Sequence, residues 1–277
     1  MNTMSSSATD DVTASLPNVV IVPIPAFADN YIWAMLRPGH CVVVDPGDAA
    51  PVFKFLAERQ LELEAIIITH HHADHTGGVA ALTAHWNVPV YGPAAENIVG
   101  VTHALCEGDS VALPDFVAAP FLVMEVPGHT SGHIAYVSGD ILFCGDTLFA
   151  VGCGRLFEGT AAQLHNSLTR LAALPGTTRV YCTHEYTLSN LRFARAVETD
   201  NAELLARSFK EQARRDKGEP TLPSTVALER ATNPFLRCTE AEVMQSARDH
   251  MKQNSPRLSN PSDIFAVLRQ WKNEFRG

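Results

Sequence analysis

Four histidines and one aspartate lie within six positions in the segment "THHHADH" at residues 69–75. The apolar run "AIII" precedes it and is typical of a buried strand that ends near Thr69. Neutral imidazoles and carboxylates are ligands that zinc, iron and manganese accept. A solvated polar loop is the alternative, but nothing structural would require so many imidazoles, which repel one another once protonated. The segment therefore predicts a metal site at a strand end.

Three further titratable residues each follow an apolar run: His129 in "VPGHTSGH", Asp146 in "LFCGDTLF" and His184 in "VYCTHEYT". Any one of them could be a capping or turn residue. Together they indicate side chains that converge on a common sheet edge and supply ligands for two metals. Two metals about 3.5–4 Å apart can share a hydroxide that is nucleophilic at neutral pH. Hydrolysis without a serine or cysteine nucleophile is the predicted chemistry, and the chain has no G-x-S-x-G motif.

The predicted secondary structure that positions these residues changes from mixed strands and helices to helices alone near residue 186. Before it, short β-branched runs separated by Gly, Pro and Asp predict strands, and helical spacing intervenes at 50–60, 77–86 and 160–174. This mixture predicts an α/β (or α+β) domain. The predicted strands cover residues 18–24, 30–36, 41–45, 64–69, 88–92, 121–126, 133–137, 140–145 and 179–183.

After residue 186 the spacing is helical, at 189–198, 202–215, 240–252 and 261–275. The last of these segments starts with "PSD", a typical helix-entry sequence. We therefore expect a flexible tail at residues 1–16, a catalytic domain at 17–186 and a C-terminal helical domain at 187–277.

Composition excludes several functional classes. A net charge of -9 argues against non-specific nucleic-acid binding. The polar, acidic N-terminal segment does not resemble a signal peptide, and no stretch is apolar enough to span a membrane. The six cysteines include no C-x-x-C pair, and several lie in apolar runs. Reduced thiols and a cytoplasmic location are expected.

The order T-H-x-H-x-D-H, G-H-T-x-G-H, G-D and a final strand-end histidine resembles the metallo-β-lactamase fold superfamily. That resemblance implies an αββα sandwich with two divalent metal ions at one edge of its stacked sheets. Zinc is the expected metal, with iron and manganese as the alternatives. The implied ligands are His70, His72 and His129 for one metal, Asp74, His75 and His184 for the other, and Asp146 as the bridge. His71 and His133 match motif positions that orient or pack beside ligands.

Four other segments resemble the glyoxalase II family of hydroxyacylglutathione hydrolases. They are "GDTLFAVGCGRLFEGT" at 145–160, "VYCTHEYTLSNLRFA" at 180–194, "GEPTLPST" at 218–225 and "NPFLR" at 233–237. The likeness runs from about residue 20 to 275 and includes the helical part. It implies hydrolysis of S-D-lactoylglutathione to D-lactate and glutathione, in methylglyoxal detoxification, by a monomer. Asp74 and Asp146 would act in catalysis as well as in metal binding.

A glutathione thioester is anionic, and the family pattern supplies cations at Arg155, Arg269 and Lys272, with Tyr186 as a further substrate contact. Arg269 and Lys272 are three positions apart on the predicted last helix, so they share a face suited to a carboxylate. A solvated charged face is the alternative for such a pair. Phe157 stands where some members carry tyrosine, which removes one hydroxyl contact.

Rival hypotheses come from other classes. A mononuclear-iron glutathione persulfide dioxygenase has related His/Asp motifs, but it would use one metal and consume oxygen. A β-lactamase or lactonase would not account for "GCGRLFEGT" or "NPFLR". A non-enzymatic protein that binds glutathione conjugates would leave the thioester intact. Metal stoichiometry and thioester turnover discriminate among these hypotheses.

Overall fold

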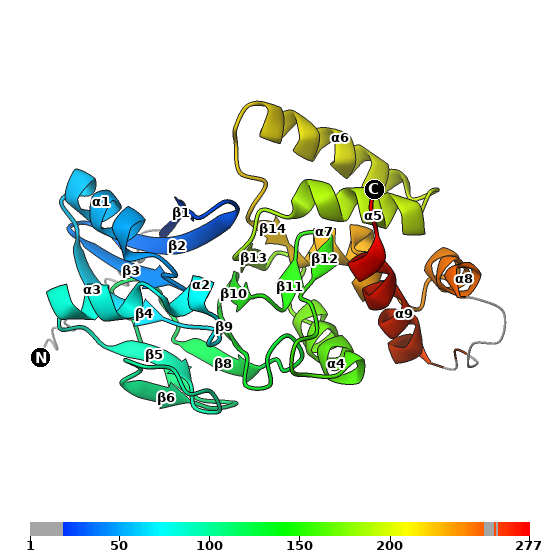
Figure 1. Ribbon diagram of the computed structural model, residues 1–277. Helices are drawn as coiled ribbons and strands as arrows, with labels where there is room; N and C mark the ends of the chain where they lie inside the picture. Colours follow the sequence, from blue (N-terminus) through cyan, green and yellow to red (C-terminus); the bar gives the residue numbers. More distant parts are fainter. Residues whose placement is uncertain (1–18, 252–257, 259) are drawn as a thin grey trace, which may run out of the picture.

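Two six-stranded sheets lie face to face at the centre of the molecule in the computed structural model, which describes residues 19–251, 258 and 260–277 (Figure 1). Helices cover the outer faces, so the αββα sandwich is confirmed. One apolar cluster fills the space between the sheets and contains Trp33 and Met35 of the first sheet and Phe121 and Phe143 of the second. The tail expected at residues 1–16 lies outside the described residues.

The first sheet has the strand order β1-β2-β3-β4-β5-β6. Its first three strands pair antiparallel, and β3 to β6 pair parallel. Side chains alternate between its two faces: Trp33 and Met35 point into the sandwich, whereas Ile32 and Ala34 pack under the outer helices. The strands are β1 Val20–Ala26, β2 Asn30–Arg37, β3 His40–Val44, β4 Glu62–Ile67, β5 Val90–Pro93 and β6 His103–Leu105.

The second sheet has the order β14-β13-β10-β9-β8-β7, and β10 and β13 are its parallel pair. A separate hairpin, β11 Leu148–Phe149 with β12 Gly152–Cys153, leaves the end of β10. The strands of the second sheet are β7 Ser110–Val111, β8 Phe121–Glu125, β9 Ile134–Ser138, β10 Ile141–Gly145, β13 Arg179–Cys182 and β14 Ser224–Thr225.

All nine predicted strands are present. The sequence analysis missed β6, β7, β11, β12 and β14, which are two or three residues long and therefore too short to show a period. It also missed α7 Val226–Thr232 and the short turn of helix α2 Ala73–Thr76. The other helices before residue 187 are α1 Ala49–Arg59, α3 Val79–His85 and α4 Ala161–Ala172.

The helices after residue 186 lie beside the second sheet, and most of them contribute side chains to the apolar cluster that contains its strands (Figure 1). The last helix begins with a capping box, in which the Asn260 side chain accepts from the Asp263 amide and the Asp263 carboxylate accepts from the Asn260 amide. Ile264, Phe265 and Leu268 on this helix belong to the same apolar cluster as both sheets. The helices are α5 Thr187–Val197, α6 Ala202–Asp216, α7, α8 Ala241–His250 and α9 Pro261–Glu274, with a 3₁₀ turn at Pro234–Leu236.

Within the described residues, no helix combines the length and the apolar character needed to cross a bilayer.

Candidate metal centre and substrate cavity

The seven predicted metal ligands gather at one edge of the sandwich, although they come from four separate strand ends. His70 and His72 follow β4, and Asp74 and His75 lie on α2, which begins directly afterwards. The other three follow strands of the second sheet: His129 after β8, Asp146 after β10 and His184 after β13. The edge therefore collects ligands from both sheets.

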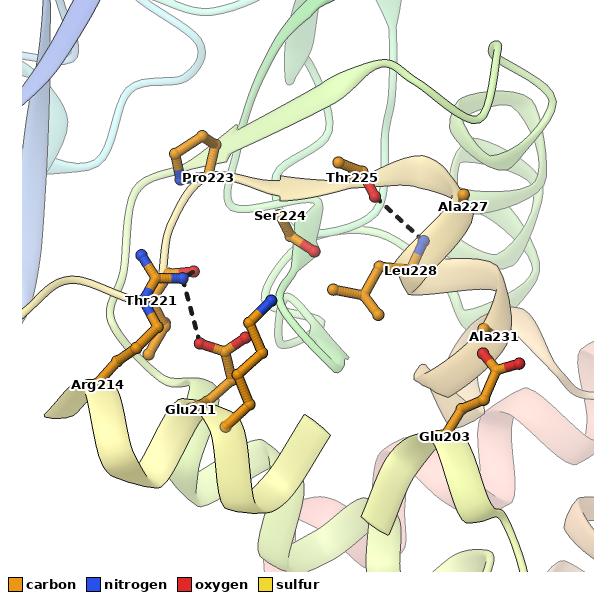
Figure 2. Close-up of a pocket in the computed structure, with 11 residues that line it drawn as sticks. Glu203, Glu211, Arg214, Thr221, Pro223, Ser224, Thr225, Ala227, Leu228 and Ala231 are labelled. Carbon is orange, nitrogen blue, oxygen red and sulfur yellow. Dashed lines mark hydrogen bonds and ion pairs between the residues drawn. The ribbon is translucent and has the colours of Figure 1, made fainter. Parts of the chain in front are cut away.

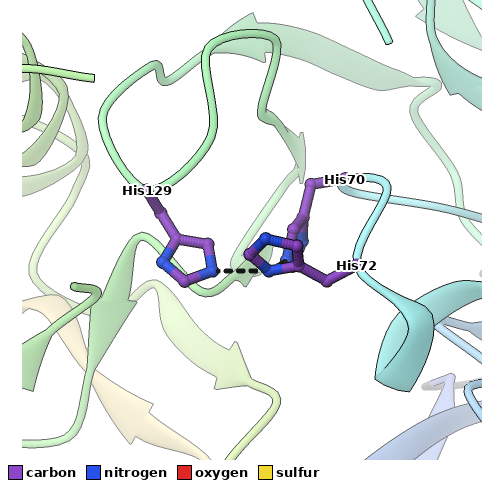
Figure 3. Close-up of side chains that lie close together, drawn as sticks. All are labelled: His70, His72 and His129. Atoms are coloured by element: carbon purple, nitrogen blue, oxygen red, sulfur yellow. Dashed lines mark hydrogen bonds between the residues drawn. The ribbon is translucent and has the colours of Figure 1, made fainter. Parts of the chain in front are cut away.

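The first group is His70, His72 and His129, whose rings converge (Figure 3). His72 Nδ1 lies 3.1 Å from His70 Nε2 and 3.0 Å from His129 Nε2. Burial lowers the pKa of His70 well below its usual value and also lowers the pKa of His72 and of His129. Neutral imidazoles with facing ring nitrogens are the form that binds a metal.

Hydrogen bonds on the outer ring nitrogens decide where the lone pairs of this group point. The Thr69 hydroxyl donates to Asp45 at 2.7 Å, so it accepts from His70 Nδ1 at 3.1 Å. His129 Nδ1 donates to the Arg155 carbonyl oxygen at 2.9 Å. His70 Nε2 and His129 Nε2 then each carry a lone pair that faces His72 Nδ1. An N–H on His72 Nδ1 could donate to at most one of them. A cation between the three rings resolves this conflict.

The second group is Asp74, His75 and His184. Asp74 Oδ2 lies 3.6 Å from His75 Nε2 and 3.5 Å from His184 Nε2. Asn30 Nδ2 donates to the same Asp74 oxygen at 3.1 Å and fixes its orientation. The group therefore offers one carboxylate and two imidazoles to a second ion.

Asp146 lies between the two groups. Its Oδ1 is 3.4 Å from His75 Nε2, and its Oδ2 is 3.3 Å from His184 Nε2 and 3.4 Å from His129 Nε2. Burial opposes ionisation of this carboxyl, but the neighbouring His75 and His184 outweigh it and hold its pKa well below the usual value. Asp146 is thus an anion in contact with both groups, as a bridging ligand would be.

Two carboxylates that the sequence analysis did not single out orient the second group. His75 Nδ1 lies 3.0 Å from Asp45 Oδ2, and His184 Nδ1 lies 2.9 Å from Asp29 Oδ1. Each contact leaves Nε2 facing the centre, the arrangement usual for metal-binding histidines. Asp45 ends a strand in "CVVVD" and could have been found by the rule that found Asp146, whereas Asp29 has no local signal.

Two buried atoms at the centre test whether cations fit. Among the described residues, His75 Nε2 and Asp146 Oδ1 are buried and have no hydrogen-bond partner. Leaving such atoms unpaired is costly, and each faces the space between the ligand groups. The two donor groups, imidazoles and carboxylates joined by Asp146, suit two divalent metal ions.

The two remaining histidines of the motifs lie beside the ligands. His133 Nε2 accepts from the Asp146 amide at 3.1 Å, and its ring stacks on His70 with centroids 4.6 Å apart. His71 lies between two glutamates, with Nδ1 2.9 Å from Glu96 and Nε2 3.2 Å from Glu158. His71 therefore joins the ligand segment to the loop that carries the residues expected to bind substrate.

A cavity of about 790 Å³ opens over Asp74, Asp146 and His184. Its size is within the range of small-ligand sites. All five residues expected to contact substrate line it: Arg155, Phe157, Tyr186, Arg269 and Lys272. The Tyr186 ring stacks on His184 with centroids 4.6 Å apart, and the Phe157 ring meets His72 and His129 edge-on at 5.4 and 5.2 Å.

Arg269 and Lys272 share a helix face as predicted, but their donors differ in availability. Arg269 is only 4% exposed, and its guanidinium donates to the Cys153 and Gly154 carbonyl oxygens at 2.9 and 3.4 Å and to Asn273 at 3.0 Å. Lys272 Nζ donates to the Ser189 carbonyl oxygen at 3.0 Å. Burial, and next the charge of Arg269, lower the pKa of Lys272 to about 8.

Gly154 explains why the hairpin of β11 and β12 can lie against the metal centre. A Cβ at this position would be 2.0 Å from the Asp146 backbone oxygen and 3.1 Å from His129 Nδ1. Only glycine permits that approach. The hairpin thereby brings Arg155, the next residue, to the cavity.

A separate cavity of about 470 Å³ lies between α6 and residues 221–231 (Figure 2). No predicted site residue lines it. Arg214 there donates to Glu211 at 3.3 Å and to the Thr221 carbonyl oxygen at 3.2 Å. These charged groups satisfy one another, so they do not form a second site of the predicted kind.

Comparison with protein families gives two matches that together cover most of the chain. The metallo-beta-lactamase superfamily matches residues 29–184. The family described as hydroxyacylglutathione hydrolase C-terminus matches residues 185–275. The first match contains all seven predicted metal ligands, and the second contains Tyr186, Arg269 and Lys272.

Individual relatives are similar over nearly the whole chain. A hydroxyacylglutathione hydrolase of Nitrosomonas europaea is 49% identical over 257 residues, which cover 93% of this chain and 97% of that protein. One of Cupriavidus taiwanensis is 56% identical over 269 residues and covers 92% of this chain and 99% of its own length.

Solved structures show the same fold at lower identity. ETHE1 from Myxococcus xanthus has a TM-score of 0.60 and 26% identity, covering 92% of this chain and 97% of its own. TTHA1623 in a di-iron-bound form has a TM-score of 0.56 and 26% identity, covering 78% of this chain and all of its own. The second structure holds two metal ions in a related fold.

Proposed function

Because the chain belongs to the hydroxyacylglutathione hydrolase family of the metallo-β-lactamase superfamily, we propose that it cleaves S-D-lactoylglutathione to D-lactate and glutathione. Thioester hydrolysis is the activity of the family. The observation that carries the choice of substrate is the single cavity that joins the His/Asp centre to cationic side chains of the C-terminal part. Related 2-hydroxyacylglutathiones are substrates as well, since the acyl chain lies at the metal centre rather than among the cations.

His70, His72 and His129 would hold one ion, Asp74, His75 and His184 the other, and Asp146 both, with zinc as the metal and iron or manganese as alternatives. When bound, two such ions supply a hydroxide at neutral pH and polarise the thioester carbonyl. Hydrolysis of S-D-lactoylglutathione would serve methylglyoxal detoxification.

The chain's own residues orient the reactants. Asn30 holds the Asp74 carboxylate in one orientation, so Asp74 accepts a hydrogen bond from the attacking water and aims it at the thioester carbon. The carbon–sulfur bond then breaks, and sulfur leaves as a thiolate. Because the pKa of a cysteine thiol is about 8.5, this leaving group needs no strong general acid.

The walls of the cavity hold the glutathionyl part. Phe149, Phe157 and Tyr186 form apolar surfaces that exclude water beside the centre. Lys272 supplies a positive charge to a substrate carboxylate, and Arg269 positions the β11–β12 hairpin from behind. Arg155 is exposed at the cavity, and its guanidinium has no hydrogen-bond partner among the described residues.

The persulfide dioxygenase alternative is not favoured. It requires one iron, whereas this centre has ligands for two ions. The family matched by residues 185–275 is that of the hydrolase.

Two broader parts of the proposal are a cytoplasmic location and a monomeric state. The six cysteines are free and five of them are buried, which suits a reducing compartment. Every residue assigned to the centre comes from one chain, so a monomer has a complete site.

The experiment that tests this function is thioester hydrolysis of S-D-lactoylglutathione by the purified protein, with bound metals counted by elemental analysis. Turnover with two metals per chain is expected. Asp146→Asn should keep the side-chain volume but remove the charge between the two groups, so both the metal count and kcat should fall, with kcat lower by about 100-fold. Wild-type metal content and rate in this variant would refute the bridging role, and a metal-loaded wild type without turnover would refute the substrate.

A further inference from the structure

The cavity holds one more cationic side chain than the sequence analysis assigned to the proposed substrate. A glutathione thioester carries a glycyl carboxylate at one end and a γ-glutamyl carboxylate at the other. Four cationic side chains line the cavity: Arg155, Arg269, Lys272 and Arg276. The sequence analysis assigned the first three and did not consider Arg276.

Of the guanidinium nitrogens of Arg269, only Nε, which is buried, has no hydrogen-bond partner among the described residues. Its side chain is buried, and both terminal nitrogens of its guanidinium are bonded to Cys153, Gly154 and Asn273. Its guanidinium carbon also lies 5.2 Å from the centre of the Phe235 ring. Arg269 therefore fixes β12 against α9, and its charge acts on the cavity from behind the wall.

Arg276 is in the opposite situation. Its side chain is exposed at the cavity, and among the described residues it makes no hydrogen bond or ion pair. A free guanidinium presents a planar fork that matches a carboxylate bidentately.

The backbone on both sides of Arg276 is anchored, which places the side chain at the cavity. The Phe275 ring packs edge-on against Phe193 with centroids 5.4 Å apart. On the other side, Arg192 Nε donates to the Gly277 carbonyl oxygen at 3.1 Å. Lys272 Nζ lies 6.0 Å from the centre of the Phe275 ring, so the Lys272 ammonium is close to the residue that precedes Arg276.

We propose that Arg276 binds a carboxylate of the glutathionyl moiety and is a specificity-determining residue of this enzyme. The proposal rests on the proposed function. It adds Arg276 to the cations, Arg269 and Lys272, that the sequence analysis assigned to a carboxylate.

The test compares wild type with Arg276→Gln and Arg276→Lys on three thioesters. These are S-D-lactoylglutathione, its glycyl ethyl ester, and S-D-lactoyl-N-acetylcysteinylglycine, in which an acetyl group replaces the γ-glutamyl group. With the full substrate, Arg276→Gln should raise KM about three- to tenfold and leave kcat within about twofold, because the contact is the same in the ground and transition states. Arg276→Lys should recover part of the loss.

The truncated substrates identify the carboxylate. If Arg276 binds the glycyl carboxylate, wild type and Arg276→Gln should have the same KM for the ethyl ester. If it binds the γ-glutamyl carboxylate, the equal KM values should appear with S-D-lactoyl-N-acetylcysteinylglycine. Either pattern supports the proposal, whereas an unchanged KM for the full substrate, or the same rise with all three substrates, overturns it.

Arg195→Gln is the matched control, because Arg195 is also exposed on the C-terminal part but lines a different groove. It removes the same charge and should leave all three KM values unchanged. Calorimetric binding of S-methylglutathione to wild type and Arg276→Gln separates this proposal from the proposed function. A Kd that is about three- to tenfold weaker in the variant supports the Arg276 contact even if the wild type turns over no thioester, and equal Kd values overturn it.

Discussion

At the scale of single residues, the centre is organised by what each histidine does with its outer nitrogen. His75 and His184 contact Asp45 and Asp29 through Nδ1, and His129 contacts a backbone carbonyl. For His75, burial opposes the charged form, but Asp146 and Asp45 outweigh it and raise the pKa well above the usual value. The same carboxylates that favour an imidazolium here would favour a bound cation in its place.

Lys272 gives a pH prediction at this scale. Burial and the neighbouring Arg269 lower its pKa to about 8, so the ammonium is present below that pH and is lost as the pH rises through it. KM for S-D-lactoylglutathione should therefore rise between about pH 7.5 and 9, while any kcat change has a different origin. Lys272→Arg should remove the rise because a guanidinium stays protonated over this range. KM of the wild type and of Lys272→Arg is measured from initial rates at each pH, corrected for spontaneous hydrolysis. A wild-type KM that stays constant across this pH range would contradict the prediction.

The same shift has a consequence for stability. The folded-state pKa lies below the ordinary value, so between about pH 8 and 10 the unfolded chain binds more protons at this lysine than the folded chain does. Lys272 alone therefore makes folding more favourable as the pH rises through that window.

At the scale of elements, His71 connects three loops that surround the cavity. Glu96, whose side chain is buried, accepts from the Gly132 amide at 3.2 Å and contacts both Thr130 and His71. Glu158 accepts from the amide and the hydroxyl of Ser131, each at 2.9 Å, and lies on the loop that carries Phe157. The loops are thereby held against the ligand segment.

Glu158→Gln tests this connection. It removes the charge opposite His71 and weakens the bonds to Ser131, so the loop with Arg155 and Phe157 should lose its fixed position. We expect KM to rise about two- to fivefold, with the metal count and kcat close to wild type. Glu58→Gln on α1, an exposed carboxylate far from the cavity, is the control and should change neither constant. Loss of metal from Glu158→Gln would assign Glu158 to the centre instead.

The buried carboxylate of Glu229 on α7 makes a second connection between elements. It accepts from Arg207 of α6 at 2.7 Å, from Asn233 at 3.0 Å and from the amide of Val151 at 2.7 Å. Val151 has a φ of 58°, which a β-branched residue rarely adopts. Glu229 thus joins the C-terminal helices to the hairpin that carries the substrate loop.

Glu229→Gln should leave the Arg207 charge buried without a counter-ion. The expected loss in the free energy of unfolding is about 3–5 kcal/mol, measured by urea denaturation of the metal-loaded protein. Glu203→Gln on α6 is the control, because this carboxylate is exposed. It should change the free energy of unfolding by about 0.5 kcal/mol or less. Equal stability of the two variants would show that the buried network contributes little.

At the scale of the whole molecule, the metal centre lies where the edges of the two sheets meet. His70 and His72 come from the end of β4 in the first sheet, whereas His129, Asp146 and His184 come from the second. Metals bound there join the two layers of the sandwich directly. Binding and folding are therefore expected to be coupled.

Removal of the metals should lower thermal stability as well as activity. A ligand present at about 1,000 times its Kd contributes about 4 kcal/mol per site, which corresponds to a Tm lower by about 10 °C or more for the stripped protein. Calorimetry before and after chelation, and again after zinc is restored, measures the effect. An unchanged Tm in protein shown to be free of metal would contradict a structural contribution of the centre.

Much of this protein follows from local sequence. The apolar runs and the residues that end them predicted nine strands, an α/β or α+β domain and a common edge for the His/Asp side chains, because strand periodicity and strand ends are local properties. The αββα arrangement was implied by the resemblance of the His/Asp motifs to a known superfamily. Five short strands, α2 and α7 escaped prediction. The strands are two or three residues long, so they show no period and form only by pairing with the rest of the fold.

Only the tertiary structure decided how the side chains at that edge are used. Asp29 is distant from His184 in the chain and has no motif of its own, yet the fold brings the carboxylate to the ring. Arg269 and Lys272 share a helix face, as their spacing requires, but the Arg269 guanidinium donates to the Cys153 carbonyl oxygen. The Arg276 guanidinium, in contrast, has no partner among the described residues and lines the cavity. Spacing determines which residues share a face, whereas burial and long-range hydrogen bonds determine which of them remains available to a ligand.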